Sequence, residues 1–510
     1  MTEGESIYEF LRDHLDEAGR LSDPDLRLPD EKTDTSGLRW APGAMDGVLG
    51  HHAGSADSDQ AQAVADAIVK ASRRPTKRRL RDLYRAVDTD GVLEYVDAAI
   101  ELVAQAGADP TRVHDVGRWL ATTGSNRSAV KVGIALIGVS GLDRDVDVVR
   151  VLGAHEEFTL FAAVALKNGL DDPDSELWAL AAAVDGWGRI HCVEQLRDTD
   201  DPAIRSWILR EGFRNSVMYE YLAHIAATTG DLLSALRAEA PDRELLTAAG
   251  EIIEALVQGG PAPDLEDYTE GADAVEAYLS HMATRAETLG DFHAVDAIRS
   301  FLDRDGSWDE LSQQGWTATR RAAFEDLCAQ ILDRDVWNDL IAVALLSDNG
   351  GEFWRADQAA RRRGIDTYDI HLRRVREDPL GHGWFAAWQQ ADAVRAQELA
   401  TLACALLPLD QIASGPADEL GLGQEWRANS ALDWSLQALR DHPGVGAELI
   451  VAGLQSPVTR NRNMALQALK GWPADLWPDR ARDLATALAD HDPNPQTREL
   501  AGEVCGVRPG

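Results

Sequence analysis

The chain has 510 residues, and its 86 acidic and 50 basic residues give a formal charge of −36. A single hydrophobic core stops growing at about 250 to 300 residues, so several domains or an array of repeats are expected. The negative charge repels phosphate backbones and anionic lipid, which makes nucleic acid an unfavoured partner.

The cysteines and the apolar runs indicate a cytoplasmic protein. Cys192, Cys328, Cys404 and Cys505 lie far apart and form no CxxC motif, so we expect reduced thiols and neither a zinc knuckle nor a redox motif. No uncharged apolar run approaches the ~20 residues of a membrane span, and residues 1–11 lack the apolar core of a signal peptide. No membrane association is therefore expected.

Residues 1–58 are predicted to form a first helix, over 7–18, followed by a polar loop and a glycine-rich segment. The glycines between Leu38 and Gly54 suit turns and close backbone approach. Asp46, His51 and His52 could offer three metal ligands. Adjacent histidines on extended backbone point to opposite sides, and a fourth ligand is missing, so we assign no metal site.

From residue 59 to 258 the apolar residues repeat at intervals of three and four, which predicts one helix after another. Short links with Gly, Asp or Pro between them are typical of antiparallel helix pairs. Helices are expected at 59–71, 76–87, 91–106, 110–122, 127–139, 144–153, 156–168, 174–185, 187–197, 202–211, 216–228 and 242–258.

Two stretches rich in glycine, proline and acid interrupt this rhythm and mark candidate boundaries. The first is a linker at 259–272, and the second is a loop at 413–424. Between them, residues 273–412 form a helical region rich in Trp and Arg, where Trp384 and Trp388 share a helical face and should pack between layers. Residues 425–510 return to short helices.

A repeated spacing occurs near the C-terminus. Arg462-x-x-Ala465-x-x-Ala468 and Arg498-x-x-Ala501 each begin five residues after a proline, and a looser copy leads from Arg189 to Cys192. The small residues share one helical face, where they let a neighbouring helix approach closely. This pattern resembles the second helix of HEAT-like repeats, and the resemblance implies an all-α fold, an α-solenoid of stacked helix pairs.

A narrower resemblance covers Gly186-Trp-Gly-Arg-Ile-His-Cys-Val-Glu-Gln-Leu196, Trp207-Ile-Leu-Arg-Glu-Gly212 and Asn215-Ser-Val-Met-Tyr-Glu-Tyr-Leu222. These strings are similar to uncharacterised bacterial proteins, some of them labelled limonene hydroxylase. The label would imply a monooxygenase, whose oxygen chemistry requires haem, flavin or iron. No motif for such a group occurs, and the P-loop, GxGxxG, GxSxG and HExxH motifs are also missing.

Aromatic and titratable side chains gather on two neighbouring predicted helices near residues 187–221. The set comprises Trp187, Arg189, His191, Glu194, Tyr219, Glu220 and Tyr221. In a common groove these side chains could bind a small ligand or transfer protons, whereas on solvated faces they would form salt bridges between repeats. No nucleophile accompanies them, so we assign no catalytic residue and expect no cofactor.

Three functions remain open. The leading hypothesis is a non-enzymatic scaffold that binds a protein partner. The alternative is a small-molecule-binding protein or an enzyme, with its pocket near 187–221 or beneath the loop from Trp40 to His52. The third is nucleic-acid binding, which needs two basic clusters to form one face. These clusters are Arg73, Arg74, Lys77, Arg78, Arg79, Arg81 and Arg85, and Arg361, Arg362, Arg363, Arg373, Arg374 and Arg376.

Overall fold

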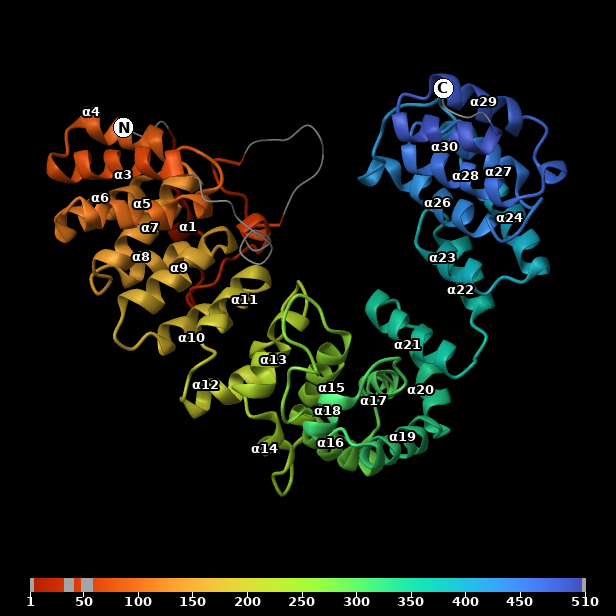
Figure 1. Cartoon of the computed structure of the whole chain (residues 1–510), viewed down its shortest axis with the longest axis horizontal. Helices are drawn as coiled ribbons and strands as arrows, with labels where there is room; N and C mark the ends of the chain where they lie inside the picture. Colours follow the sequence, from red (N-terminus) through yellow and green to blue (C-terminus); the bar gives the residue numbers. More distant parts are fainter. Residues whose placement is uncertain (1–3, 32–40, 47–57, 507–510) are drawn as a thin grey trace. The chain divides into compact units, whose positions relative to one another are not determined.

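The computed structural model describes residues 4–31, 41–46 and 58–506. Within these ranges all regular structure is helical, and the only β-type pairings are two isolated bridges (Figure 1). None of the helices in these ranges is long and apolar enough to cross a membrane. The chain divides into two compact units, and the boundary between them in the described sequence lies between Trp337 and Asn338.

The first unit contains the helices from α1 to α19. Their bounds are α1 (Ile7–Asp13), α3 (Ser58–Arg73), α4 (Lys77–Ala86), α5 (Val96–Gln105), α6 (Pro110–Thr123), α7 (Arg127–Ser140), α8 (Val146–Gly153), α9 (Glu156–Gly169), α10 (Asp174–Ala183), α11 (Gly186–Gln195), α12 (Pro202–Trp207), α13 (Glu220–Thr228), α14 (Leu232–Leu236), α15 (Arg243–Gln258), α16 (Gly271–Arg285), α17 (Leu289–Leu302), α18 (Asp309–Gln313) and α19 (Ala318–Leu332). The series expected between 59 and 258 is confirmed within a few residues at most ends.

Local side-chain bonds explain where these helices start. Asp109 and Asp201 each accept two backbone N–H groups of the following turn, and each precedes a proline in the first helical position. The aspartate satisfies donors that a helix start leaves open, and proline lacks a donor there. Asn494 and Pro495 start α30 (Pro495–Cys505) in the same way.

The first helix is shorter than the range 7–18 predicts, since it ends at Asp13. The carboxylate of Asp16 accepts the backbone N–H groups of Ala18 (2.8 Å) and Arg20 (2.9 Å), and Gly19 has a φ of 76°. These local bonds stabilise a turn in place of the helix. The short helix α14 was not predicted.

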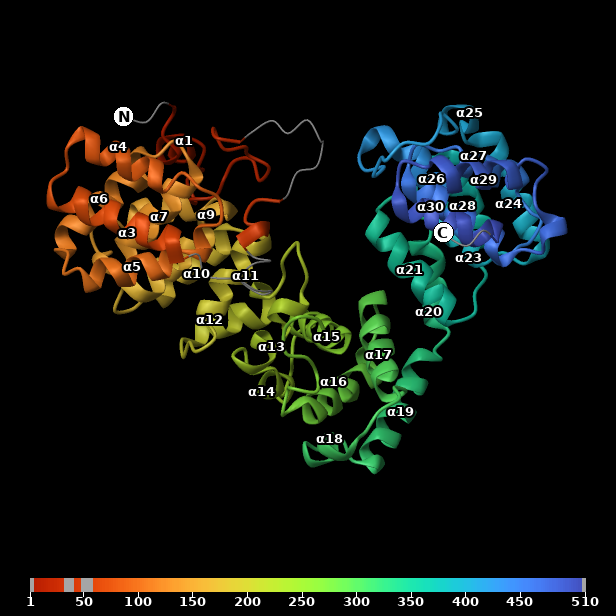
Figure 2. The ribbon, with the colours of Figure 1, turned by 45° about the horizontal axis from the view of Figure 1, so that its top comes forward.

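From α3 onward, most helices of the first unit pack on the next helix or on the next but one, whereas α1 packs on α6 and α8. Helices α6 and α7, α8 and α9, and α10 and α11 form consecutive pairs, and α7, α9, α11, α13, α15, α17 and α19 contact one another in that order (Figures 1 and 2). Glycines permit the closest approach: a Cβ on Gly133 of α7 would lie 2.5 Å from the backbone nitrogen of Ala121 in α6.

The predicted linker at 259–272 lies inside the first unit. Leu265 and Tyr268 are buried, and the Leu265 N–H donates to the Leu256 carbonyl at 3.1 Å. The acidic stretch from Asp303 to Trp308 connects α17 with α18.

The second unit repeats the same manner of packing. Its helices are α21 (Gly350–Arg362), α22 (Tyr368–Glu377), α23 (Gly383–Gln389), α24 (Ala393–Leu406), α25 (Leu409–Ile412), α26 (Arg427–Leu439), α27 (Ala447–Leu454), α28 (Thr459–Gly471), α29 (Ala481–His491) and α30, after α20 (Val336–Ala344) at the boundary. One row consists of α23, α26, α28 and α30, and the other of α24, α27 and α29.

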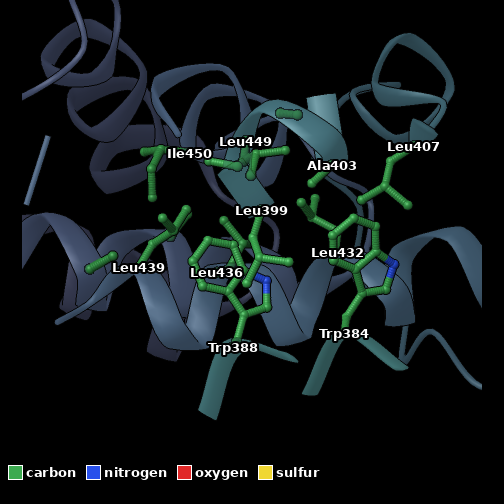
Figure 3. Close-up of a cluster of buried hydrophobic side chains, with 14 of the residues drawn as sticks. Trp384, Trp388, Leu399, Ala403, Leu407, Leu432, Leu436, Leu439, Leu449 and Ile450 are labelled. Atoms are coloured by element: carbon green, nitrogen blue, oxygen red, sulfur yellow. The ribbon is translucent and has the colours of Figure 1, made fainter. Parts of the chain in front are cut away.

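The two tryptophans of α23 lie in the core between these rows. Trp384 and Trp388 are buried as expected and point toward Leu399 of α24, Leu432 and Leu436 of α26, and Leu449 and Ile450 of α27 (Figure 3). Their indole N–H groups donate to the Pro379 carbonyl (2.8 Å) and the Ser435 hydroxyl (3.0 Å). The buried donors are therefore satisfied.

The 36-residue spacing of Arg462 and Arg498 corresponds to a repeated hydrogen-bond pattern. Arg462 Nη1 donates to the carbonyls five and six residues before it, at 2.9 and 2.8 Å, and Arg498 Nη1 donates to the two equivalent carbonyls. Ala465, Ala468, Ala501 and Cys192 are all fully buried, which confirms the predicted packing of the small residues.

Candidate functional site

A cleft of about 500 Å³ lies in the first unit beside α9, α10 and α11. Its wall combines charged groups with apolar surface and one tryptophan. The charged and aromatic lining residues are Arg20, His155, Glu156, Asp185, Arg189, Trp207 and Glu211, and the apolar ones are Leu21, Pro24, Pro42, Ala154, Ala182, Ala183 and Val184. The volume is in the range of small-molecule sites.

Glu156 is the half-buried acid in this wall. It is the first residue of α9, and its carboxyl group faces the backbone N–H groups of Gly188 and Trp187 at the start of α11. Burial raises the pKa of Glu156 to about 7, with Asp185 contributing in the same direction and the Gly188 N–H opposing it. Glu156 can therefore exchange a proton near neutral pH.

Three glycines make room for Glu156. A Cβ on Gly186 would lie 2.5 Å from its Oε2, and a Cβ on Gly43 would lie 2.5 Å from its carbonyl oxygen. A Cβ on Gly188 would lie 3.2 Å from its Cγ. Gly43 and Gly186 also have positive φ angles, of 71° and 48°, a region that L-residues with a side chain rarely adopt. Glycines of two distant segments thus contact the same residue, Gly186 and Gly188 at its side chain and Gly43 at its backbone.

A buried ion cluster lies next to Glu156. Lys131 of α7, only 6% exposed, contacts Asp46 at 2.5 Å and Glu157 at 2.6 Å. Arg127 contacts Asp30 at 3.1 Å and Glu157 at 3.5 Å. Burial raises the pKa of Asp46 against the effect of Lys131, whereas for Glu157 the two cations outweigh burial and lower the pKa. These pairs attach the N-terminal segment to α7 and α9.

His155 is a neutral structural group beside the cleft. Its Nδ1 accepts the Glu157 N–H at 3.2 Å, so Nε2 carries the proton toward the Leu26 carbonyl, also at 3.2 Å. Burial is the main cause of its lowered pKa. The ring therefore holds the N-terminal segment in place.

The predicted site residues are spread over more than one environment. Arg189 lines the cleft, where its guanidinium donates to the carbonyls of Ala181 (3.2 Å), Val184 (3.1 Å) and Arg214 (2.9 Å). Trp187 lies between His191 and Tyr221, with ring centroids 6.1 and 5.1 Å apart, and all three side chains are buried.

Of the other three predicted residues, Glu194 contacts this aromatic group. Glu194 is 3.7 Å from His191 Nδ1, and Tyr219 meets the ring of Phe213 edge-on. Glu220 begins α13 and is half-buried. Neither they nor the aromatic trio are among the cleft-lining residues, so a ligand-binding role for the seven as one set stays a prediction.

Sequence reasoning missed Glu156, Asp185 and Glu211, which line the cleft together with Arg189. A signal was present in the Gly186-Trp-Gly188 string, because two glycines this close together permit a neighbouring group to approach the backbone. The identity of that neighbour is not encoded locally, because Glu156 lies 30 residues before Gly186.

The second proposed pocket position falls partly on Trp40, His51 and His52, which lie outside the described residues. Asp46 is described, and it is engaged with Lys131. Among the described residues no group of three or more His, Cys, Asp or Glu side chains is arranged to hold a metal ion. Burial raises the pKa of the Cys192 thiol, so this residue is a poor nucleophile.

A Ser–His–Asp arrangement occurs near the ends of α6 and α7, away from the cleft. His114 Nε2 lies 2.8 Å from Asp145, and its Nδ1 lies 3.5 Å from the Ser140 hydroxyl. That hydroxyl donates to the Leu136 carbonyl of its own helix, and Asp145 also pairs with Arg118. We interpret the group as a helix-end contact, since the serine is not directed at the histidine.

Comparison of the chain with protein-family models and with curated proteins finds no match. Neither a HEAT family nor the proteins labelled limonene hydroxylase are identified in this way. The fold and the site define the class of protein: it is all-helical, its many helices pack in sequence, and its first unit contains a charged cleft.

Proposed function

We propose that the protein is an α-solenoid of HEAT-like helix pairs and that it acts as a non-enzymatic scaffold for a protein partner. The architecture is supported by two rows of successive helix contacts, one through α7, α9, α11, α13, α15, α17 and α19 in the first unit and one through α23, α26, α28 and α30 in the second. The repeated arginine–carbonyl bonds of Arg462 and Arg498 support it as well. Stacked pairs of this kind offer long continuous surfaces for binding.

The observation that carries the scaffold function is an apolar groove of about 670 Å³ on α24 in the second unit. One face of α24, with Leu399 and Ala403, packs into the core (Figure 3). Ala393, Val394, Leu402 and Ala405 of the same helix line the groove; Leu402 also packs against the core, whereas Val394 is 79% exposed. Several exposed apolar side chains next to one another, rather than a single one, are typical of a surface that a partner covers.

The partner that fits this groove is an amphipathic helix with basic residues beside its apolar face. The groove is shallow and follows a helix, so a second helix can lay its apolar stripe along it. Glu398 lies at the groove with Arg376 as its 3.7 Å partner, and the chain as a whole carries a charge of −36. Glu398 and Arg376 offset each other in the groove, so the net negative charge of the chain is the feature that favours a basic segment over an acidic one.

The experiment combines site-specific crosslinking with one variant in the groove. A photoreactive residue at Gln397 should capture a segment of one protein in source cells, and that segment should be amphipathic and basic. Val394→Asp should weaken the association at least about tenfold, because it places a charge in the apolar centre of the contact.

Val343→Asp provides the matched control, because Val343 is 72% exposed on α20 and lies outside the groove. It should leave the association unchanged. Equal binding by both variants, or a captured segment that is acidic, would contradict the proposal.

The cleft at Glu156 favours a second candidate function, the binding of a small molecule, with or without catalysis. It has the size of a ligand site and includes a carboxyl group that titrates near neutral pH. A monooxygenase, as the labelled proteins would imply, would additionally require a group that handles oxygen.

A further inference from the structure

We propose that the cleft beside Glu156 binds a small organic cation, such as an alkylammonium or guanidinium compound, between its carboxylates and the ring of Trp207. This inference rests on the second candidate function, small-molecule binding at the cleft. It adds the chemical class of the ligand.

The charges of the cleft favour a cation. Glu156, Asp185 and Glu211 line it, and none of the three has an ion-pair partner within 4 Å among the described residues. Asp185 uses one carboxylate oxygen to accept the Ser216 N–H at 3.1 Å, which leaves its other oxygen available. Glu211 is exposed toward the solvent.

The cationic side chains among the described residues of the cleft form no ion pair with these carboxylates. Arg189 directs its guanidinium to three backbone carbonyls and thereby fixes the wall. Arg20 is an exposed residue of the N-terminal segment. His155 is neutral, and Lys131 is already shared between Asp46 and Glu157. A bound cation would therefore supply the positive charge that Glu156 lacks.

The apolar surface completes the site. Trp207 is half-buried in the wall, and a cation over an indole face gains an attraction that grows when water is excluded. Ala182, Ala183 and Val184 can contact the hydrocarbon part of a ligand. Carboxylates together with an aromatic ring favour an organic cation over a metal ion.

Binding should depend on pH through Glu156. Its pKa is about 7, so the carboxylate that a cation needs is scarce in mildly acidic solution. The groups around it are Asp185 and Arg189 at α11, His155 and Glu157 on α9, Arg20 from the N-terminal segment and Glu211 after α12. A cation should release a proton from Glu156 as it binds, and its affinity should fall by about thirty-fold between about pH 8.5 and pH 5.5.

The test is calorimetric titration of the full chain with butylammonium, guanidinium and, as the anionic counterpart, butyrate. Two buffers with different ionisation enthalpies report the protons released.

Glu156→Gln and Glu211→Gln should each weaken cation binding. Glu211 is exposed, so its variant keeps the test valid even if Glu156→Gln disturbs folding. Glu239→Gln, an exposed glutamate outside the cleft, should leave binding unchanged.

The outcomes separate this inference from the function on which it rests. Cation binding that both variants weaken, with proton release, supports it. Preferential binding of butyrate would overturn the cation assignment and leave small-molecule binding standing. Cation binding that is unaffected in both variants would also overturn it. If none of the probes bound at the cleft, both the inference and the second candidate function would fall.

Discussion

Glu156 should leave a signature in the pH dependence of stability. Its native pKa of about 7 lies above the ordinary value of 4.5, so unfolding in this interval releases a proton. The protonated Glu156 side chain makes its full contribution to the free energy of unfolding below about pH 4.5, and this contribution is lost as the pH rises to about 7. Between these limits the unfolding free energy should fall by about 2 to 3 kcal/mol more in the native chain than in Glu156→Gln.

Urea unfolding of both proteins over this pH range measures the difference, and the many other carboxylates cancel in the comparison. Parallel curves for the two proteins would show that Glu156 ionises in the native state as it does in water.

Arg462 is a second residue whose buried surroundings should make it important for the stability of the fold. It is fully buried, and Nε and Nη2 donate to the two carboxylate oxygens of Asp492 at 2.7 and 2.9 Å. Arg462→Ala leaves the buried Asp492 without its counter-charge, so we expect a loss of about 3 to 5 kcal/mol in urea unfolding. Arg462→Met combined with Asp492→Leu should recover most of this loss.

Arg498 is the control for this prediction, because it occupies the equivalent repeat position but is only half-buried and has no ion pair with a carboxylate among the described residues. Arg498→Ala should cost much less than Arg462→Ala. Similar losses for both would indicate that the carbonyl bonds, and not the ion pair, stabilise the repeat.

At the scale of elements, the contact of α27 with α28 depends on small side chains. Ala465 is fully buried, and a Cβ on Gly453 of α27 would lie 3.0 Å from the Ala465 Cβ. Ala465→Leu should therefore overpack this interface and lower the unfolding free energy by about 1 to 3 kcal/mol. Ala487→Leu, on the exposed side of α29, is the matched control and should be nearly neutral. A neutral Ala465→Leu would mean that the helices can separate at little cost.

Helix positions were predictable where local signals agree, and less so where they compete. The Asp-Pro starts of α6 and α12 are readable from the sequence, because cap and proline act on adjacent residues. The helix expected at 216–228 begins only at Glu220, since the Asn215 side chain accepts the N–H groups of Val217 and Met218 in a turn. The helix expected at 202–211 changes to a π-helical turn after Trp207.

At the scale of the whole molecule, the distribution of charge argues against nucleic acid as a partner. The two basic clusters belong to different units, and the second cluster is partly neutralised because Arg361 pairs with Asp357 and Arg376 with Glu398. In the first cluster Lys77, Arg81 and Arg85 are exposed and have no ion pair among the described residues. The attraction of these few cations for phosphate is opposed by the net charge of −36 on the whole chain.

We therefore expect no binding of duplex DNA in a mobility-shift experiment at about 50 mM salt, where phosphate contacts are strong. Duplex binding that disappears in a variant with Arg81→Glu and Arg85→Glu would contradict this expectation and assign the first cluster to nucleic acid.

The sequence by itself determined the all-helical class, the helix series from 59 to 258 and the burial of Cys192 and Ala465. Apolar periodicity, helix starts and small-residue spacing act within a few turns of chain, so they can be read locally. Only the tertiary structure decided that Gly43, Gly186 and Gly188 meet at Glu156, that Arg189 rather than Tyr221 reaches the cleft, and that Arg462 pairs with Asp492. These relations join residues 30 or more positions apart or depend on which side of a helix faces its neighbour, and packing between helices sets both.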